Sequence, residues 1–182
     1  MSSLDAMSVA QVDPPTDALV LTSLARIDYA DAFRLALPHG APETIDGLLR
    51  ATLLATPAWV SGLMSARDGV VRRLGLKTAE QPGPLPERFV LGQRLGIVRV
   101  LARDAREIVL GEDDRHLDFR ASLLLEETSP RALVLTTVVL FHHPLGRAYF
   151  APVAPVHRRI VPAMLRAAGM RMASRTSAAD AR

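Results

Sequence analysis

One segment of the chain alternates polar and apolar residues, and its polar members could do chemistry together. A β-strand would put them on one face, because successive side chains point to opposite sides. Arginine can then bind an anionic or carbonyl group in a bidentate way, while a carboxylate orients a nearby histidine. The alternative, which we favour, is an outward-facing strand with paired charges. The polar residues are His116, Asp118, Arg120 and Ser122.

Two residues in the C-terminal third are further candidates. His157 titrates near neutrality, so it could act as a general acid or base, or it could simply hydrogen-bond to the sheet. Tyr149 could turn its hydroxyl into a pocket or hold it at the surface. With His116, Asp118 and Arg120, these two residues form our set of candidate ligand-binding residues.

A metal site is a weaker hypothesis. His116-x-Asp118, together with His142 or His157, has the composition of a two-histidine, one-carboxylate site, but that ligand set is generic and we predict no metal. The chain has no cysteine, which excludes disulfides and thiolate chemistry. It also lacks a G-x-G-x-x-G motif, a P-loop and a nucleophile elbow, so we predict no cofactor.

The overall charge gives little information about partners. The 182 residues include 22 Lys and Arg against 19 Asp and Glu, and the high pI of 10.1 reflects the use of Arg in place of Lys. Because the cations are scattered and aromatic residues are only 4%, we expect no nucleic-acid partner. The longest apolar run, residues 132–141, is half as long as a membrane span, and the first residues lead us to expect no secretory signal. We therefore expect a cytoplasmic protein without a membrane partner.

The hydrophobic pattern predicts one domain, residues 19–170, between disordered tails at residues 1–18 and 171–182. Period two predicts a strand at residues 29–37, with Tyr29 and Asp31 on the same side as Phe33. Two helices should follow, the first from Pro42 and the second at residues 56–75 with Trp59 in the core.

Four further strands are predicted at residues 95–103, 106–111, 116–127 and 132–142, and their short joins require antiparallel neighbours. The last of these is apolar on both sides, so its second face should be covered by the helix pair, a tail or another subunit. Residues 143–146 suit a type I turn. A final helix should begin at Pro155, bury Val156 and kink or break at Pro162.

Several segments resemble the bacterial family called domain of unknown function 2867. The most specific is the decapeptide at residues 111–120. The others are residues 59–76, Thr136-Thr137-Val138-Val139, Gly146-Arg147-Ala148-Tyr149 and Val153-Ala154-Pro155-Val156-His157-Arg158. The resemblance implies a helix-grip fold like that of START lipid carriers and polyketide cyclases: an α+β domain whose curved antiparallel sheet wraps around a long C-terminal helix, with two helices after the first strand. It also implies a cavity between sheet and helix. Val156, often Phe in relatives, and Pro162 are departures that would change its shape.

Three functions follow as hypotheses, and whether the protein is an enzyme stays open. The first is binding of a small hydrophobic or amphipathic molecule. The second is a cyclase- or aromatase-like enzyme in which His157, Tyr149 and Arg120 position a polyfunctional carbonyl compound. The third is an interaction module that forms a homodimer through its covered sheet face.

Overall fold

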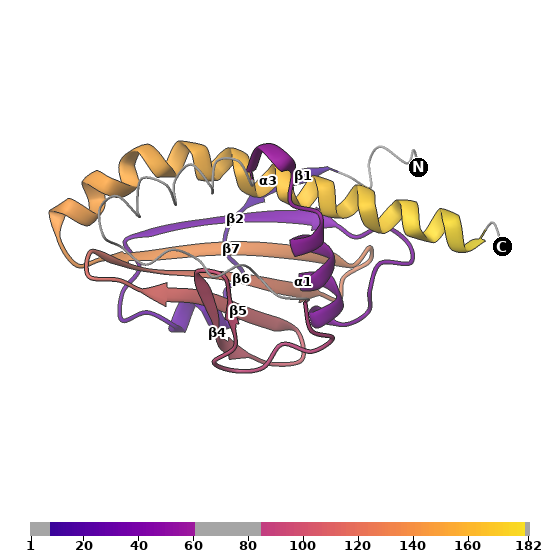
Figure 1. Ribbon diagram of the computed structural model, residues 1–182, viewed down its shortest axis with the longest axis horizontal. Coiled ribbons are helices and arrows are strands. Elements are labelled where there is room, and N and C mark those ends of the chain that lie inside the picture. Colours follow the sequence, from indigo (N-terminus) through magenta and orange to yellow (C-terminus); the bar gives the residue numbers. More distant parts are fainter. Residues whose placement is uncertain (1–7, 61–84, 181–182) are drawn as a thin grey trace.

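The computed structural model describes residues 8–60 and 85–180 (Figure 1). Within these residues a single antiparallel sheet has the order β1-β2-β7-β6-β5-β4-β3. The predicted class is confirmed: the fold is α+β, with a curved antiparallel sheet and a long C-terminal helix in a helix-grip arrangement. The elements are β1 (Val9–Val12), η2 (Leu19–Thr22), β2 (Tyr29–Ala36), α1 (Ile45–Leu54), β3 (Arg94–Leu95), β4 (Val98–Arg103), β5 (Glu107–Asp113), β6 (Leu117–Glu126), β7 (Ala132–Phe141) and α3 (Pro144–Asp180).

One face of the sheet, the inner face, packs against α1 and α3. Leu35 of β2 and Leu133 of β7 are fully buried there beneath Leu165 of α3. Each such side chain contributes about 1.5–3 kcal/mol by leaving water. In Figure 1, α3 follows the long direction of the sheet and curves over it. The inner face is therefore the side on which a sheet–helix site would lie.

The opposite or outer face is covered by the chain's own N-terminal segment. Val20 of η2 is fully buried against an apolar set from four strands. The buried carboxylate of Glu107 accepts hydrogen bonds from the amides of Leu19 (2.6 Å) and Val20 (3.3 Å) and so fixes η2 over the sheet. The residues beneath η2 are Ala32, Val109, Leu124, Val134 and Val138.

The predicted tails are too long. Residues 9–12 form β1, which pairs with β2 at the sheet edge, and η2 follows before the predicted first strand. At the other end, α3 continues to Asp180. Both departures have one cause: pairing and packing with distant residues order segments that have no clear period of their own.

The start of the last helix is also corrected. α3 begins at Pro144, so the predicted turn at residues 143–146 is its first turn, with the Gly146 amide bonded to the His143 carbonyl at 2.9 Å. The helix continues through Pro155 and unbroken through Pro162. Proline suits the first helical position, which Pro144 occupies, so the local signal was real but was assigned to the wrong proline.

Three smaller predictions are wrong. Thr44 caps α1 by accepting the Gly47 amide at 3.2 Å, so the helix starts after Pro42. Val156 and Trp59, both expected in the core, are 40% and 49% exposed. Most of the second predicted helix, residues 56–75, lies outside the described residues.

Candidate functional site

A group of polar side chains lies on the inner face where β2 and β7 pass beneath α3. We call Tyr29, Asp31, Thr137 and His157 the Asp31 cluster. Asp31 and Thr137 are directly paired across β2 and β7, and Tyr29 shares their face because side chains two apart point the same way. His157 enters from α3, and its Nε2 lies 3.1 Å from Thr137 Oγ1 and 3.4 Å from Asp31 Oδ1.

Asp31 is the most constrained member of this cluster. Its side chain is 2% exposed, and its Oδ2 accepts the Tyr29 hydroxyl. Its Oδ1 is fully buried and accepts no hydrogen bond; its polar neighbour is the His157 ring. A buried carboxylate oxygen without a hydrogen bond is costly, so this position favours a donor beside Oδ1.

Tyr29 is held in its protonated form. Burial, then the hydrogen bond to Asp31 and the charge of Asp31, raise the pKa of Tyr29 to about 12, although the nearby Arg158 guanidinium acts in the opposite direction. At neutral pH Tyr29 is therefore a fixed donor to Asp31, and His157 is the member of the cluster best suited to exchange a proton.

Aromatic side chains surround the polar cluster on one side. Phe150 of α3 meets the Tyr29 ring edge-on, with centroids 4.8 Å apart, and lies 5.5 Å from Phe141. Leu117 and Val139 complete this small core, and Phe119 packs against it while partly exposed. The site thus combines a polar end with an apolar wall, which is the usual character of a small-molecule site.

Of the five predicted site residues, only His157 belongs to this cluster. Tyr149 is 48% exposed on α3. Asp118 and Arg120 alternate with Leu117 and point to the outer face, away from α3. The enzyme arrangement that required His157, Tyr149 and Arg120 to converge is therefore wrong, because these residues lie on different surfaces.

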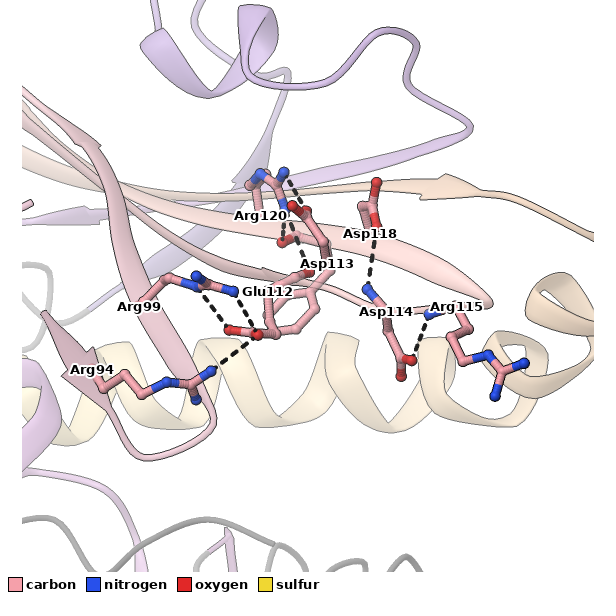
Figure 2. A network of polar contacts seen from close by, with 9 residues as sticks. Arg94, Arg99, Glu112, Asp113, Asp114, Arg115, Asp118 and Arg120 are labelled. Carbon is pink, nitrogen blue, oxygen red and sulfur yellow. Dashed lines mark hydrogen bonds and ion pairs between the residues drawn. The ribbon is translucent and has the colours of Figure 1, made fainter. Parts of the chain in front are cut away.

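The outer-face charges have partners close by in the β5–β6 hairpin. Arg120 pairs with Asp113 at 2.6 Å and donates to the Phe119 carbonyl at 3.0 Å (Figure 2). Asp118 meets His142, the residue after β7, at 3.0 Å. These contacts are those of a salt-bridged strand. The half-buried His116 lies at the end of the hairpin, where its carbonyl accepts the His142 amide.

Packing explains why the specific decapeptide contains a glycine. Gly111 lies directly opposite Arg120, and a β-carbon at Gly111 would stand 2.8 Å from Arg120 Cδ and 2.3 Å from the Phe119 carbonyl oxygen. The arginine side chain passes across the space that glycine leaves open on its way to Asp113. Gly111 and Arg120 of this decapeptide therefore have a structural role in the hairpin.

The metal hypothesis finds no support in the geometry. Within residues 8–60 and 85–174, no three His, Asp or Glu side chains gather closely enough to hold an ion. Asp118 does approach His142, but His157 lies on the other face of the sheet.

Sequence reasoning missed Tyr29 and Asp31 as site residues, although a signal was present. Both were assigned to the apolar side of the first strand, next to Phe33, and an aspartate on a buried face needs a partner. The partner, His157, is 126 positions away, and only the folded structure shows the pair.

An open hollow of about 530 Å³ lies elsewhere, between the end of α1 and the C-terminal half of α3. Its lining includes Leu54, Ala167 and Met170, and it is more than two helical turns along α3 from His157. We take the Asp31 cluster as the candidate site because it contains the buried polar groups that the hollow's lining lacks.

Comparison with known proteins gives one result. The profile of a family described as "Protein of unknown function (DUF2867)" matches residues 23–164, which is more than three-quarters of the chain. No curated protein and no solved structure matches.

Proposed function

The chain belongs to the DUF2867 family, and from the geometry of the Asp31 cluster we propose that it binds a small, largely apolar molecule with one polar end, as START-like helix-grip proteins do. The molecule would lie between the sheet and the first half of α3. Its polar end would meet Asp31 and His157, and its apolar part would contact Phe150 and Phe141.

The observation that carries this proposal is the buried Asp31 Oδ1, which accepts no hydrogen bond. A buried polar atom without a hydrogen bond costs free energy, so a donor supplied by a ligand would stabilise this arrangement. A hydroxyl or amine of a ligand could donate to Oδ1. His157, which is 22% exposed, would be the point of entry.

Native mass spectrometry of the purified protein, compared with the denatured mass of the same sample, is the direct test. We expect a native species heavier by a discrete organic mass. Asp31→Asn should lose this mass, whereas Tyr149→Phe, which alters an exposed residue of α3, should keep it.

Titration with the neutral dye Nile red provides a second measurement when the ligand is lost during purification. Saturable binding that is weakened in Asp31→Asn but kept in Tyr149→Phe supports the site. The proposal is contradicted if the native mass equals the denatured mass and the correctly folded protein shows no saturable dye binding.

One contact favours a second function. His157 Nε2 lies within ion-pair distance of Asp31, a geometry that can orient an imidazole for proton transfer. A cyclase- or aromatase-like enzyme on a carbonyl compound would use this pair without Tyr149 or Arg120. Incubation of the recovered ligand with fresh protein separates the two functions: the enzyme would change the mass or absorbance of the compound, and a carrier would return it unaltered.

A further inference from the structure

The first turns of α3 expose an apolar face to solvent. Residues 144–156 contain one charged side chain, Arg147. Spacings of four, four and three residues place four large exposed side chains on one side of the helix. We call these four the α3 stripe: Leu145 (61% exposed), Tyr149 (48%), Val153 (38%) and Val156 (40%).

This stripe is not the side of α3 that faces the core. Phe150 and Ala154, on the opposite side, already contact the protein. A surface helix normally turns polar residues toward water, so α3 is apolar on both sides here. Contiguous exposed apolar surface of this kind marks an interaction site.

The charged side chains that α3 itself places around the stripe have one sign. Every charged side chain on α3 up to Ser174 is an arginine. Arg158 and Arg159, both exposed, follow the stripe directly. Arg147 beside it is 65% exposed and shares Asp28 with Arg26 at 3.1 Å. We call Arg26, Arg147, Arg158 and Arg159 the rim of the stripe. In the described part of the chain the ion pairs of these arginines involve Asp28, and four cations beside one carboxylate leave the rim net positive.

We propose that the α3 stripe docks the protein on the surface of an anionic lipid bilayer. The stripe would enter the headgroup region, and the guanidinium groups of Arg158 and Arg159 would bind lipid phosphates, for which arginine is well shaped. No helix in the described part of the chain is long and apolar enough to cross a bilayer, so the contact is with the surface. Our expectation of no membrane partner considered only spanning segments.

Size and charge favour lipid over a protein partner. Thirteen helical residues extend about 20 Å, and a stripe one side chain wide buries much less than the roughly 800 Å² per partner of a stable protein interface. A second copy would bring arginines close to arginines. A bilayer surface, in contrast, needs only one apolar helix face with flanking cations.

Sedimentation with vesicles tests the proposal on the full chain. We expect binding to vesicles of phosphatidylcholine with phosphatidylglycerol, and roughly tenfold less to phosphatidylcholine alone. Leu145→Ser with Val153→Ser should reduce binding to the anionic vesicles by about tenfold. Met170→Ser is the matched control, because Met170 is 53% exposed on the same helix beyond the stripe.

Two arginine variants distinguish the effect of the rim from the effect of the protein's overall positive charge. Arg159→Gln should weaken binding several-fold, and Arg166→Gln, farther along α3, should weaken it less. Equal binding to neutral and anionic vesicles, or equal loss in the stripe and control variants, would overturn the proposal. So would a dimer that Leu145→Ser dissociates, because the occupant would then be a second copy. The vesicles contain no added ligand, so this result is independent of the Asp31 cluster.

Discussion

At the scale of single residues, burial governs the protonation of Tyr29, which is hydrogen-bonded to Asp31. Asp31 accepts the Tyr29 hydroxyl, and burial together with that contact raises the pKa of Tyr29 to about 12. The chain has two tyrosines, so Tyr149→Phe leaves Tyr29 as the sole phenol. Ultraviolet titration of this variant should give a midpoint near 12, and adding Asp31→Asn should move it toward the ordinary value of about 10.

The sign of the linked stability change follows from the same shift. The unfolded chain releases the Tyr29 proton near pH 10, whereas the folded chain retains it to about 12. The contribution of Tyr29 to stability is therefore complete below about pH 10 and lost as the pH rises through this window. A midpoint near 10 in Tyr149→Phe would show that Tyr29 is neither buried nor bonded to Asp31.

A second residue-scale prediction concerns the ion pair between α1 and β4. Asp46 and Arg103 meet through two contacts of 2.9 Å, with side chains 14% and 15% exposed. Burial opposes ionisation of Asp46, but the Arg103 guanidinium and the Phe89 amide outweigh it and lower the pKa of Asp46. Asp46→Asn should reduce the free energy of unfolding by about 3 kcal/mol at neutral pH.

This loss should depend on pH. Because the pKa of Asp46 is lowered in the folded state, its stabilisation is present above about pH 4 and disappears as the pH falls further. Urea unfolding of wild type and Asp46→Asn should therefore converge in acid. If the difference in free energy of unfolding between the two proteins stays constant below pH 4, the loss has a cause other than the charge of Asp46.

Gly146 permits the close approach of α3 to the β5–β6 hairpin. A β-carbon there would stand 2.2 Å from the His116 carbonyl oxygen, so Gly146→Ala forces the first turn of α3 away. We expect a loss of more than about 2 kcal/mol in urea unfolding. Gly169→Ala is the control in the same helix: its β-carbon would meet only Leu35 side-chain atoms, the nearest at 3.3 Å, and its effect should stay within about 1 kcal/mol.

At the scale of elements, the sequence predicted those whose pattern is local. β6 and β7 show period two or continuous apolar residues over ten positions, and their predicted ranges agree closely with the structure. β1 is four residues long and is set by its pairing with β2, so no local signal marks it. His157 could be named as a candidate because an imidazole can act as an acid or a base, whereas the sequence does not reveal the contact of Arg120 with Asp113.

η2 gives a prediction at this scale. Its position over the outer face depends on Glu107, which binds the Leu19 and Val20 amides. Glu107→Gln removes the charge from these hydrogen bonds, so amide hydrogen exchange in residues 18–24 should increase by about tenfold. Glu126→Gln alters a more exposed carboxylate, which pairs with Arg34, and should leave this exchange unchanged. Equal exchange in both variants would mean that Val20 packing alone holds η2.

At the scale of the whole molecule, the family match and the folded unit begin at different residues. The match begins at residue 23, but the structure places β1 and η2, residues 9–22, in the same folded unit. η2 covers an apolar patch on the outer face, with Val134 and Val138 of β7 fully buried beneath it. The apolar second face of β7, which left a dimer open as a hypothesis, is thus covered in its centre by the chain itself.

A shortened chain that begins at residue 23 tests this assignment. Without η2, the outer-face patch meets water, and Val20 alone contributes about 1.5–3 kcal/mol of burial. We expect a clear loss of stability in urea and, by light scattering, self-association that the full chain does not show at the same concentration. If the shortened chain stays monomeric and equally stable, η2 is dispensable. If the full chain is already a dimer and the shortened one is not, the N-terminal segment belongs to an interface, and the dimer hypothesis regains its place.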